Sequence, residues 1–250
     1  MSRTSPPTRT LTLALALAAS ASALAAPAAD GTCSVRKTGP APTVVELYTS
    51  EGCSSCPPAE AWLNGLKGRT DVLPLAFHVN YWDNLGWPDR FASPEATDRQ
   101  RRLASLDGQR GVYTPQVRVS GRDWRRWPEL PAAAGAATAA AVPALELARD
   151  GDAFVMRVDA TARGGALAGY WAVLEDEHET RVRAGENAGA TLRHHHVVRL
   201  YRPVADWPAG QAHSARLAVS RGVPAHPRRV AFVLVDAASQ RPLQAAVLAC

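Results

Sequence analysis

The sequence predicts an α/β domain followed by an antiparallel β-sandwich domain. Before Pro143, short apolar runs alternate with segments of helical spacing, and this strand-helix-strand-helix-strand order favours an α/β unit with some parallel pairing. After Pro143, short strand-like runs are separated by Gly, Pro and Asp turns, which is typical of a sandwich. We therefore expect one domain over residues 26–142 and a second over residues 143–250.

Residues 1–25 are predicted to be a signal peptide. Arg3 and Arg9 precede an apolar run that begins at Leu11, and Ala23-Leu24-Ala25 has the small-residue form that a signal peptidase cleaves. The run is too short and too rich in Ala and Ser for a membrane span, which needs roughly 20 strongly apolar residues. The prediction is an exported protein, periplasmic or secreted, without a membrane span.

The net charge argues against nucleic acid as a partner. The chain has 28 basic and 23 acidic residues, and loss of Arg3 and Arg9 with the signal peptide leaves 26 basic residues and a net charge of +3. Residues 121–127, Gly-Arg-Asp-Trp-Arg-Arg-Trp, interleave Arg with Trp as single-strand binders do. We interpret them instead as an exposed rim with partly buried Trp side chains, and we expect no nucleic-acid partner.

The predicted α/β domain contains five elements. Strands are predicted from apolar, β-branched runs, and each helix begins at a proline, which is tolerated in the first turn; Ser93 adds an N-cap to the second helix. The elements are a strand at residues 44–48, a helix from Pro58, a strand at residues 72–79, a helix from Pro94 to about Leu106, and a strand at residues 113–119.

The predicted sandwich domain begins with a hairpin. Asp150-Gly151 separates two apolar runs and is a strong turn signal for a two-residue hairpin loop. Residues 131–142, just before this domain, are rich in alanine and fit either a packed helix or a flexible linker. Further strands are predicted at residues 167–174, 197–201, 215–219, 230–235 and 243–248.

Cys53 and Cys56 form a Cys-x-x-Cys motif between a predicted strand and a predicted helix. This is the sequence context of a thioredoxin-like redox site. The N–H groups at a helix start stabilise a thiolate, and the spacing lets the second sulfur resolve a mixed disulfide. Thr114-Pro115 supports this interpretation, because thioredoxin-like proteins place a cis-proline opposite the cysteine pair, and cis bonds occur almost only before proline.

Three stretches of the α/β domain also carry a resemblance to a known family. They read VVELYTSEGCSSCPPAE, FHVNYWDNLGWPDRFASPEATDRQR and VYTPQVRVSG, and the similarity continues through Gly185-Glu186-Asn187 and Val197-Val198-Arg199. The sequence resembles the family of exported bacterial proteins called DUF1223. The resemblance implies a thioredoxin-like fold. It implies no activity, because the family has no settled biochemical role.

Thiol-disulfide exchange is the predicted activity, with protein or small-molecule thiols and disulfides as partners and with no cofactor. Cys53 is expected to be the attacking, more exposed thiolate, and Cys56 the resolving thiol. Thr114, Pro115 and Trp82 are expected to shape the substrate groove, although Trp82 equally suits the filling of an interface between domains. Because proline disfavours helical geometry in the residue before it, the Pro57-Pro58 pair predicts that the helix begins only at Pro58.

The alternative hypothesis is a non-catalytic binding or copper/zinc-carrier module, in which the cysteine pair is a permanent disulfide or a set of metal ligands. Thiolate and imidazole together suit Cu(I) or zinc, and the chain offers His78 and the triplet His194-His195-His196. In an extended strand His194 and His196 face one way and His195 the other. We interpret the triplet as solvent-facing or as a strand cap, and His78 as a hydrogen-bonded core or rim residue, and we expect no metal.

Cys33 and Cys250 are predicted to form a structural disulfide. They are the two remaining cysteines, and leftover cysteines tend to pair in an oxidising compartment. The bond would join the two ends of the mature chain, so its Cα atoms must lie within about 7 Å of each other. If they do not pair, both cysteines are free thiols at frayed termini.

Overall fold

The structure is a computed structural model that describes residues 1–2, 33–130, 142–219 and 226–250. The predicted signal peptide and nearly all of the Ala-rich segment lie outside the described residues. The described part that follows the N-terminal gap belongs to one compact unit, which is mostly β-sheet with two α-helices. Within that described part, neither α-helix is long and apolar enough to cross a membrane.

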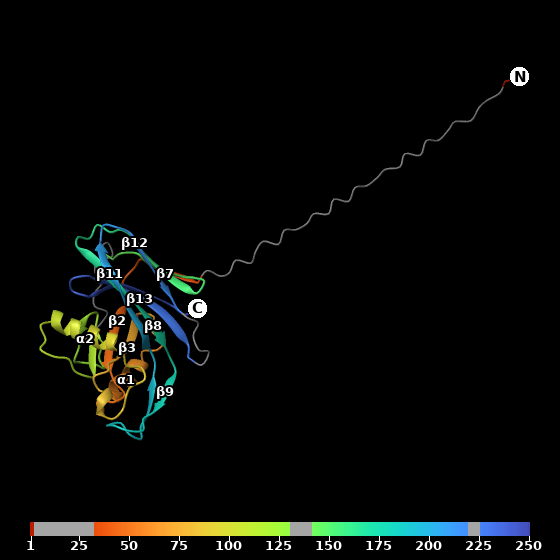
Figure 1. Cartoon of the computed structure of the whole chain (residues 1–250). Coiled ribbons are helices and arrows are strands. Elements are labelled where there is room, and N and C mark those ends of the chain that lie inside the picture. The colour runs from red at the N-terminus through yellow and green to blue at the C-terminus, as the bar shows by residue number, and fades with distance from the viewer. Residues whose placement is uncertain (3–32, 131–141, 220–225) are drawn as a thin grey trace. The chain divides into compact units, whose positions relative to one another are not determined.

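The described strands form an eight-stranded sheet, a four-stranded sheet and a two-stranded ladder (Figure 1). In spatial order, the large sheet contains β14 (Pro242–Leu248), β13 (Arg228–Asp236), β8 (Ala166–Glu175), β11 (Val197–Pro208), β3 (Val72–His78), β2 (Thr43–Thr49), β4 (Gln116–Val119) and β5 (Arg122–Asp123). The four-stranded sheet contains β1 (Ser34–Lys37), β6 (Leu145–Asp150), β7 (Ala153–Val158) and β12 (His213–Ala218), and the ladder pairs β10 (Thr191–His194) with β9 (His178–Arg181). The helices are α1 (Pro57–Asn64), α2 (Pro94–Leu106) and the short 3-10 helix η1 (Asp83–Leu85).

The large sheet contains strands from both predicted domains. β11 pairs with β3 in parallel at Val197 and Ala76, and the Ala76 N–H donates to the His196 carbonyl oxygen at 2.8 Å. On one side of this junction lie β14, β13, β8 and β11, and on the other side lie β3, β2, β4 and β5. The boundary predicted between residues 142 and 143 thus separates strands that share one sheet, and the division into two domains stays a prediction.

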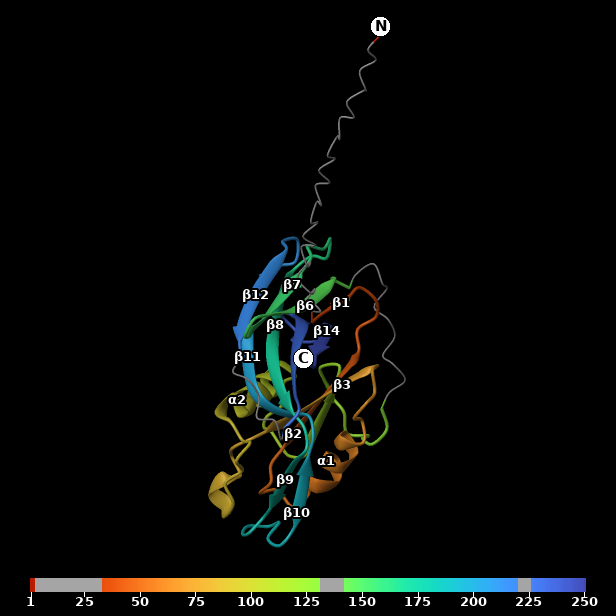
Figure 2. The ribbon, with the colours of Figure 1, turned by 90° about the vertical axis from the view of Figure 1, so that its right-hand side faces the viewer.

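The two α-helices cover opposite faces of β3 and β2, as Figure 2 shows. Alternation along β2 produces this arrangement, because successive side chains of a strand point to opposite faces. Val44 belongs to a core cluster with Leu103 of α2, whereas Val45 belongs to another with Leu63 of α1. Every residue of β2 is buried, so the strand that leads to Cys53 is fixed on both faces.

The four-stranded sheet packs against the other half of the large sheet. Their shared core contains Leu147 of β6 and Met156 of β7 together with Trp171 of β8 and Phe232 of β13. Gly169 allows the close approach within this half, because a Cβ at that position would lie 2.3 Å from Cζ of Phe232. Two sheets that bury their inner faces in this way form a sandwich-like layer.

A buried ion pair ties α2 to the large sheet. Arg99 of α2 donates to Glu46 of β2 at 2.6 Å, and the Tyr170 hydroxyl of β8 donates to the same Glu46 oxygen at 2.6 Å. Burial alone raises the pKa of Glu46, but Arg99 and Tyr170 outweigh it and lower that pKa. Because β2 and β8 lie in different halves of the sheet, this network joins the two halves through their side chains.

Most of the predicted elements are confirmed, with small shifts of their ends. β2, β3 and β4 occupy the predicted strand positions, and β2 and β3 run parallel. α2 begins at Pro94 and ends at Leu106, and the Ser93 hydroxyl accepts from the Ala96 N–H at 3.1 Å as an N-cap does. The Asp150-Gly151 turn connects β6 and β7 as an antiparallel hairpin.

The start of α1 differs from the prediction. The helix begins at Pro57 rather than Pro58, and Cys56 has helical dihedral angles, with φ −78° and ψ −35°. The Cys56 N–H donates to the Cys53 carbonyl oxygen at 3.2 Å, and the Cys56 carbonyl accepts from Ala59 at 3.0 Å. These bonds, together with the disulfide, outweigh the weak preference of a residue before proline for extended geometry.

Cys33 and Cys250 are joined in a disulfide, as predicted, with their Cα atoms 6.4 Å apart. Cys33 immediately precedes β1, and Cys250 lies two residues after β14. Arg149 of β6 holds both ends, because its backbone N–H donates to the Cys33 carbonyl at 2.8 Å and its guanidinium donates to the Cys250 carbonyl at 3.1 Å. The ends of the described fold are therefore fastened to one strand.

Candidate functional site

The Cys53–Cys56 disulfide closes a short loop between β2 and α1. The two Cα atoms are 5.5 Å apart, and Cys56 is the N-cap residue of α1, so the bond lies at the start of the helix. Cys53 and Cys56 are 1% and 0% exposed. Exposure does not separate the two cysteines in the disulfide form, because both are buried while Ser54 and Ser55 face the solvent, so the greater exposure of the Cys53 thiol stays a prediction.

A turn from the second half of the chain fastens this loop. The side-chain amide of Asn187 donates to the carbonyl oxygens of Glu51 and Cys53, at 2.8 and 2.9 Å. The Ser54 N–H donates to the carboxylate of Glu186 at 3.0 Å. Both Glu186 and Asn187 belong to the Gly-Glu-Asn motif noted in the sequence, and the structure explains that motif as a clamp on the disulfide loop.

Trp82 and Thr114 are brought together beside the loop. The Trp82 indole N–H donates to the Thr114 hydroxyl at 2.8 Å, and the Thr114–Pro115 peptide bond is cis. A Cβ placed on Gly52 would lie 3.3 Å from the Cβ of Trp82, so the indole begins next to the residue that precedes Cys53. Trp82 is only partly buried, and it packs against the core cluster under α2.

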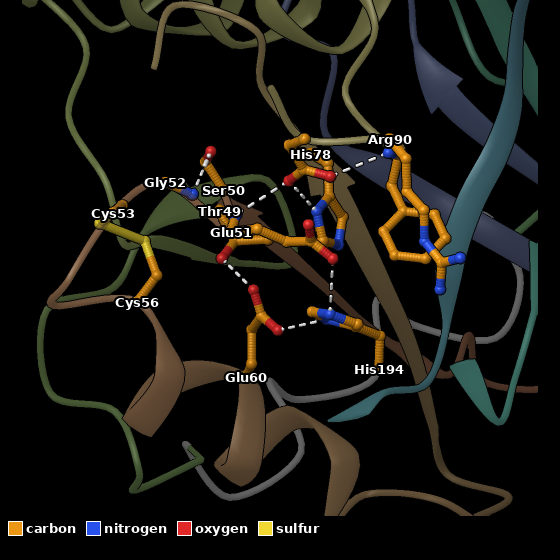
Figure 3. Close-up of polar contacts among 12 residues, drawn as sticks. Thr49, Ser50, Glu51, Gly52, Cys53, Cys56, Glu60, His78, Arg90 and His194 are labelled. Atoms are coloured by element: carbon orange, nitrogen blue, oxygen red, sulfur yellow. Dashed lines mark hydrogen bonds and ion pairs between the residues drawn. A yellow bond between two sulfur atoms is a disulfide. The ribbon is translucent and has the colours of Figure 1, made fainter. Parts of the chain in front are cut away.

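Five buried residues form an acid–histidine cluster on the inner side of the disulfide loop (Figure 3). Two of them follow or end the parallel strands β2 and β3, and one is in α1, so the cluster lies at the carboxyl edge where open α/β sheets bind ligands. Each is at most 6% exposed. The members of the acid–histidine cluster are Glu51, Glu60, His78, Asp89 and His194.

His78 is held by Asp89. Nδ1 of His78 lies 2.6 Å from Oδ2 of Asp89, and the Asp89 carboxylate also accepts from the backbone N–H groups of Glu51 and Phe91, each at 2.8 Å. Burial alone raises the pKa of Asp89, but His78 and these backbone donors outweigh it and lower the pKa to about 2. The interpretation of His78 as a hydrogen-bonded core residue is therefore confirmed.

His194 lies between two carboxylates. Its Nδ1 is 2.6 Å from Oε2 of Glu60, and its Nε2 is 3.1 Å from Oε1 of Glu51. Thr49 donates to the other Glu60 oxygen at 2.5 Å. Burial lowers the pKa of His194, but the two carboxylates outweigh it and raise that pKa to about 10, so the ring carries a positive charge at neutral pH.

The histidine triplet was predicted to be solvent-facing or a strand cap, and the first of these alternatives is wrong for two of its three members. His194 and His196 are 2% and 1% exposed, and only His195 is partly exposed. The backbone leaves the strand after His194, and His196 has a positive φ of 60°. As a result His196 contacts Asp176 and Arg229 rather than the acid–histidine cluster.

Sequence reasoning missed the carboxylates of this site. Glu51 and Glu60 bracket the cysteine motif, two residues before Cys53 and four residues after Cys56, yet they were not singled out. The available signal was Glu60, an acidic residue at the fourth position of α1 with an apolar neighbour on each side. A buried carboxylate is rarely unpaired, so such a residue predicts a polar partner in the core. Asp89 gave no signal, because it lies in a loop without a regular pattern.

The fold and the site together define a class: a mostly β-sheet protein with two disulfides, in which a Cys-x-x-Cys pair lies beside buried histidines and carboxylates. The family model DUF1223, described as a protein of unknown function, matches residues 44–235. The chain belongs to the DUF1223 family. This confirms the resemblance seen in the sequence.

Two solved structures are similar to this chain. The X-ray crystal structure of protein AGR_C_4864 from Agrobacterium tumefaciens has 28% sequence identity and a TM-score of 0.62, and the match covers 84% of this chain and 94% of that one. HBP35 of Porphyromonas gingivalis has 15% identity and a TM-score of 0.49, over 84% of this chain and 76% of that one. A search of curated proteins finds no match.

Proposed function

We propose that this protein is an exported thiol-disulfide oxidoreductase with a thioredoxin-like arrangement around its Cys53–Cys56 pair. One observation carries the proposal. A Cys-x-x-Cys disulfide closes directly ahead of a helix, and Cys56 itself is the N-cap of that helix. Two disulfides in one chain are also typical of an oxidising compartment, which supports the periplasmic or secreted location.

The reaction is a two-electron exchange between the pair and a substrate disulfide. In the reduced protein, the Cys53 thiolate attacks one substrate sulfur, forms a mixed disulfide and releases the other substrate sulfur as a thiolate. The Cys56 thiolate then attacks the Cys53 sulfur and releases the second substrate thiol. The substrate gains two electrons and two protons, and the protein pair becomes the disulfide; the reverse sequence oxidises a dithiol substrate.

Two local features would stabilise the Cys53 thiolate. The dipole of α1 favours negative charge near the cysteine pair, but its N–H groups do not contribute, because Pro57 and Pro58 have none and those of Ala59 and Glu60 donate to the Cys56 carbonyl. The hydroxyl of Ser55 lies 3.3 Å from the Cys53 sulfur, and a hydroxyl that donates to a thiolate lowers its pKa. The contact with Ser55 supports Cys53 rather than Cys56 as the nucleophile.

Substrate access is proposed to run past Trp82, Thr114 and Pro115, on the side of the loop that begins at Gly52. Because both sulfurs are buried, the loop must open before a substrate sulfur can reach Cys53. The hydrogen bonds from Asn187 to this loop are the contacts that opening has to break.

The experiment compares serine variants of all four cysteines in an exchange assay with a small aromatic disulfide. Cys53→Ser is expected to reduce exchange to the uncatalysed rate, and Cys56→Ser to accumulate a mixed disulfide on Cys53 that mass spectrometry detects. Cys250→Ser is the matched control, since it removes a disulfide distant from the site in sequence, and its exchange rate should be unchanged.

An inactive native protein whose reduced Cys53 and Cys56 alkylate at equal rates would contradict the proposal. The pair would then be a permanent staple in a non-catalytic binding module. Copper or zinc carriage through the cysteines is less supported, because the group of convergent ligand atoms found among the described residues contains no cysteine.

A further inference from the structure

The acid–histidine cluster contains three buried polar atoms that lack a hydrogen-bond partner. They are Oε1 of Glu51, Nε2 of His78 and Nε2 of His194, on side chains that are 0%, 1% and 2% exposed. The Glu51 and His194 atoms lie 3.1 Å apart and form an ion pair with each other. Nε2 of His78 has no such partner, and an unpartnered buried polar atom costs roughly 1–3 kcal/mol, so this nitrogen indicates a site built for a ligand.

Each of the two histidines is oriented by a carboxylate through its other nitrogen. Nδ1 of His78 is 2.6 Å from Asp89, and Nδ1 of His194 is 2.6 Å from Glu60. Metal-binding histidines almost always have such a partner, because it fixes the ring and makes the opposite nitrogen a better ligand. Asp89 is this partner for His78, so Nε2 of His78 can bind a metal ion directly. At His194 a metal ion would displace the proton that the ring shares with Glu60, because a histidine ligand is neutral.

The distances suit a single ion. One ligand atom from each of Glu60, His78 and His194 lies within 4.8 Å of the others. A tetrahedral ion with bonds of about 2.0–2.2 Å holds its ligands roughly 3.4 Å apart, so small side-chain rotations close the site. We propose that Glu60, His78 and His194 bind one zinc ion, independently of the cysteine pair and of its proposed activity.

The donor set favours zinc over other common ions. Imidazole nitrogen combined with carboxylate oxygen is typical of zinc, whereas Mg²⁺ prefers oxygen ligands in an octahedron and Cu(I) prefers sulfur. Glu60 also borders a cavity of about 560 Å³ between α1 and β10, which Asn64 and His195 line as well. This cavity gives an ion a route to the buried carboxylate.

The test is a zinc titration of the full chain after chelator treatment, with a chromophoric chelator as competitor and metal analysis of the dialysed product. One zinc per chain is expected, with no competition from Mg²⁺. His78→Gln and His194→Gln should each weaken zinc binding by at least about tenfold. His195→Gln is the matched control, because it changes the adjacent triplet residue outside the cluster, and it should bind zinc as the native chain does.

Two further variants keep the test decisive. Glu60→Gln preserves size and can still accept from Thr49, so its expected loss of zinc affinity answers the question if the histidine variants do not fold. The double variant Cys53→Ser with Cys56→Ser should retain full binding. Zinc binding that disappears with the cysteines, that survives the His78, His194 and Glu60 changes, or that is absent from the native chain would overturn the proposal.

Discussion

The two disulfides of this protein differ in loop length and in surroundings. Cys33–Cys250 joins residues 217 apart at the partly exposed ends of the fold, whereas Cys53–Cys56 joins residues 3 apart and is fully buried. The chain-entropy model gives the long loop roughly 5 kcal/mol of stabilisation and the short loop only about 2 kcal/mol. Exposure alone would assign the reactive role to Cys33–Cys250. Loop length and the neighbouring helix support our proposal that Cys53–Cys56 has it.

The largest expected effect on stability comes from the terminal disulfide. Cys250→Ser should lower the free energy of unfolding by up to about 5 kcal/mol, because the unfolded chain then loses its longest constraint. Urea unfolding monitored by tryptophan fluorescence measures this. A loss of unfolding free energy smaller than that caused by removing Cys53–Cys56 would show that the short disulfide stabilises the fold more than the long one.

The second expected effect is a pH dependence of the unfolding free energy that comes from His178, near the Cys53–Cys56 disulfide. Burial first, and then His226 and Arg199, lower the pKa of His178 to about 4 against the opposing Glu175, while an unfolded histidine titrates near 6.5. The stability from neutral His178 is therefore complete above about pH 6.5 and is lost as the pH falls toward 4, by up to about 3 kcal/mol.

The control for this effect is His178→Gln. Its unfolding free energy should change less than that of the native chain between pH 7 and pH 4.5. His178 makes an edge contact with the ring of Phe91, which packs against His78 and His194, so acid should loosen the neighbourhood of Cys53–Cys56 before the terminal disulfide. An identical pH dependence in the two proteins would contradict the role of His178.

Removal of the short disulfide should have a smaller effect on stability. The double variant Cys53→Ala with Cys56→Ala is expected to lose about 2 kcal/mol, since its loop contains only four residues. Urea unfolding beside Cys250→Ser gives the ratio of the two losses. Equal losses would mean that Cys53–Cys56 has a structural role that loop entropy does not describe.

The smallest expected effect concerns Asn187. Asn187→Ala removes two hydrogen bonds to the disulfide loop, each contributing about 1 kcal/mol. Cys53 in the reduced variant should therefore react faster with iodoacetamide than in the native protein, while the free energy of unfolding falls by no more than about 2 kcal/mol. An unchanged alkylation rate would show that the Asn187 turn does not control access to Cys53.

The elements were predictable where the signal is local. The run at residues 44–48 and the Ser93-Pro94 helix start encode their structure in a few neighbouring residues, and both are confirmed. The pairing of Val197 with Ala76 is not local, so the sequence could not reveal that one sheet joins both predicted domains. The rule that a residue before proline avoids helical geometry also failed at Cys56, where hydrogen bonds and the disulfide decided the backbone geometry.

The candidate site was predictable only in part, for the same reason. Cys53 and Cys56 form a motif because their spacing alone carries the chemistry. The acid–histidine cluster assembles from Glu51, Glu60 and His194, which meet only after β10 has packed beside α1. A single sequence contains no pattern that links such distant residues.

The reduction potentials of the two disulfides test the central claim most directly. The protein is equilibrated in dithiothreitol or glutathione buffers, thiols are trapped with an alkylating agent, and mass spectrometry reads each pair separately. We expect Cys53–Cys56 between about −270 and −120 mV, within the range of thiol-disulfide oxidoreductases, and Cys33–Cys250 below about −300 mV, as structural disulfides are. A value below about −300 mV for Cys53–Cys56, or a higher potential for Cys33–Cys250 than for Cys53–Cys56, would contradict the assignment of the redox role to the buried pair.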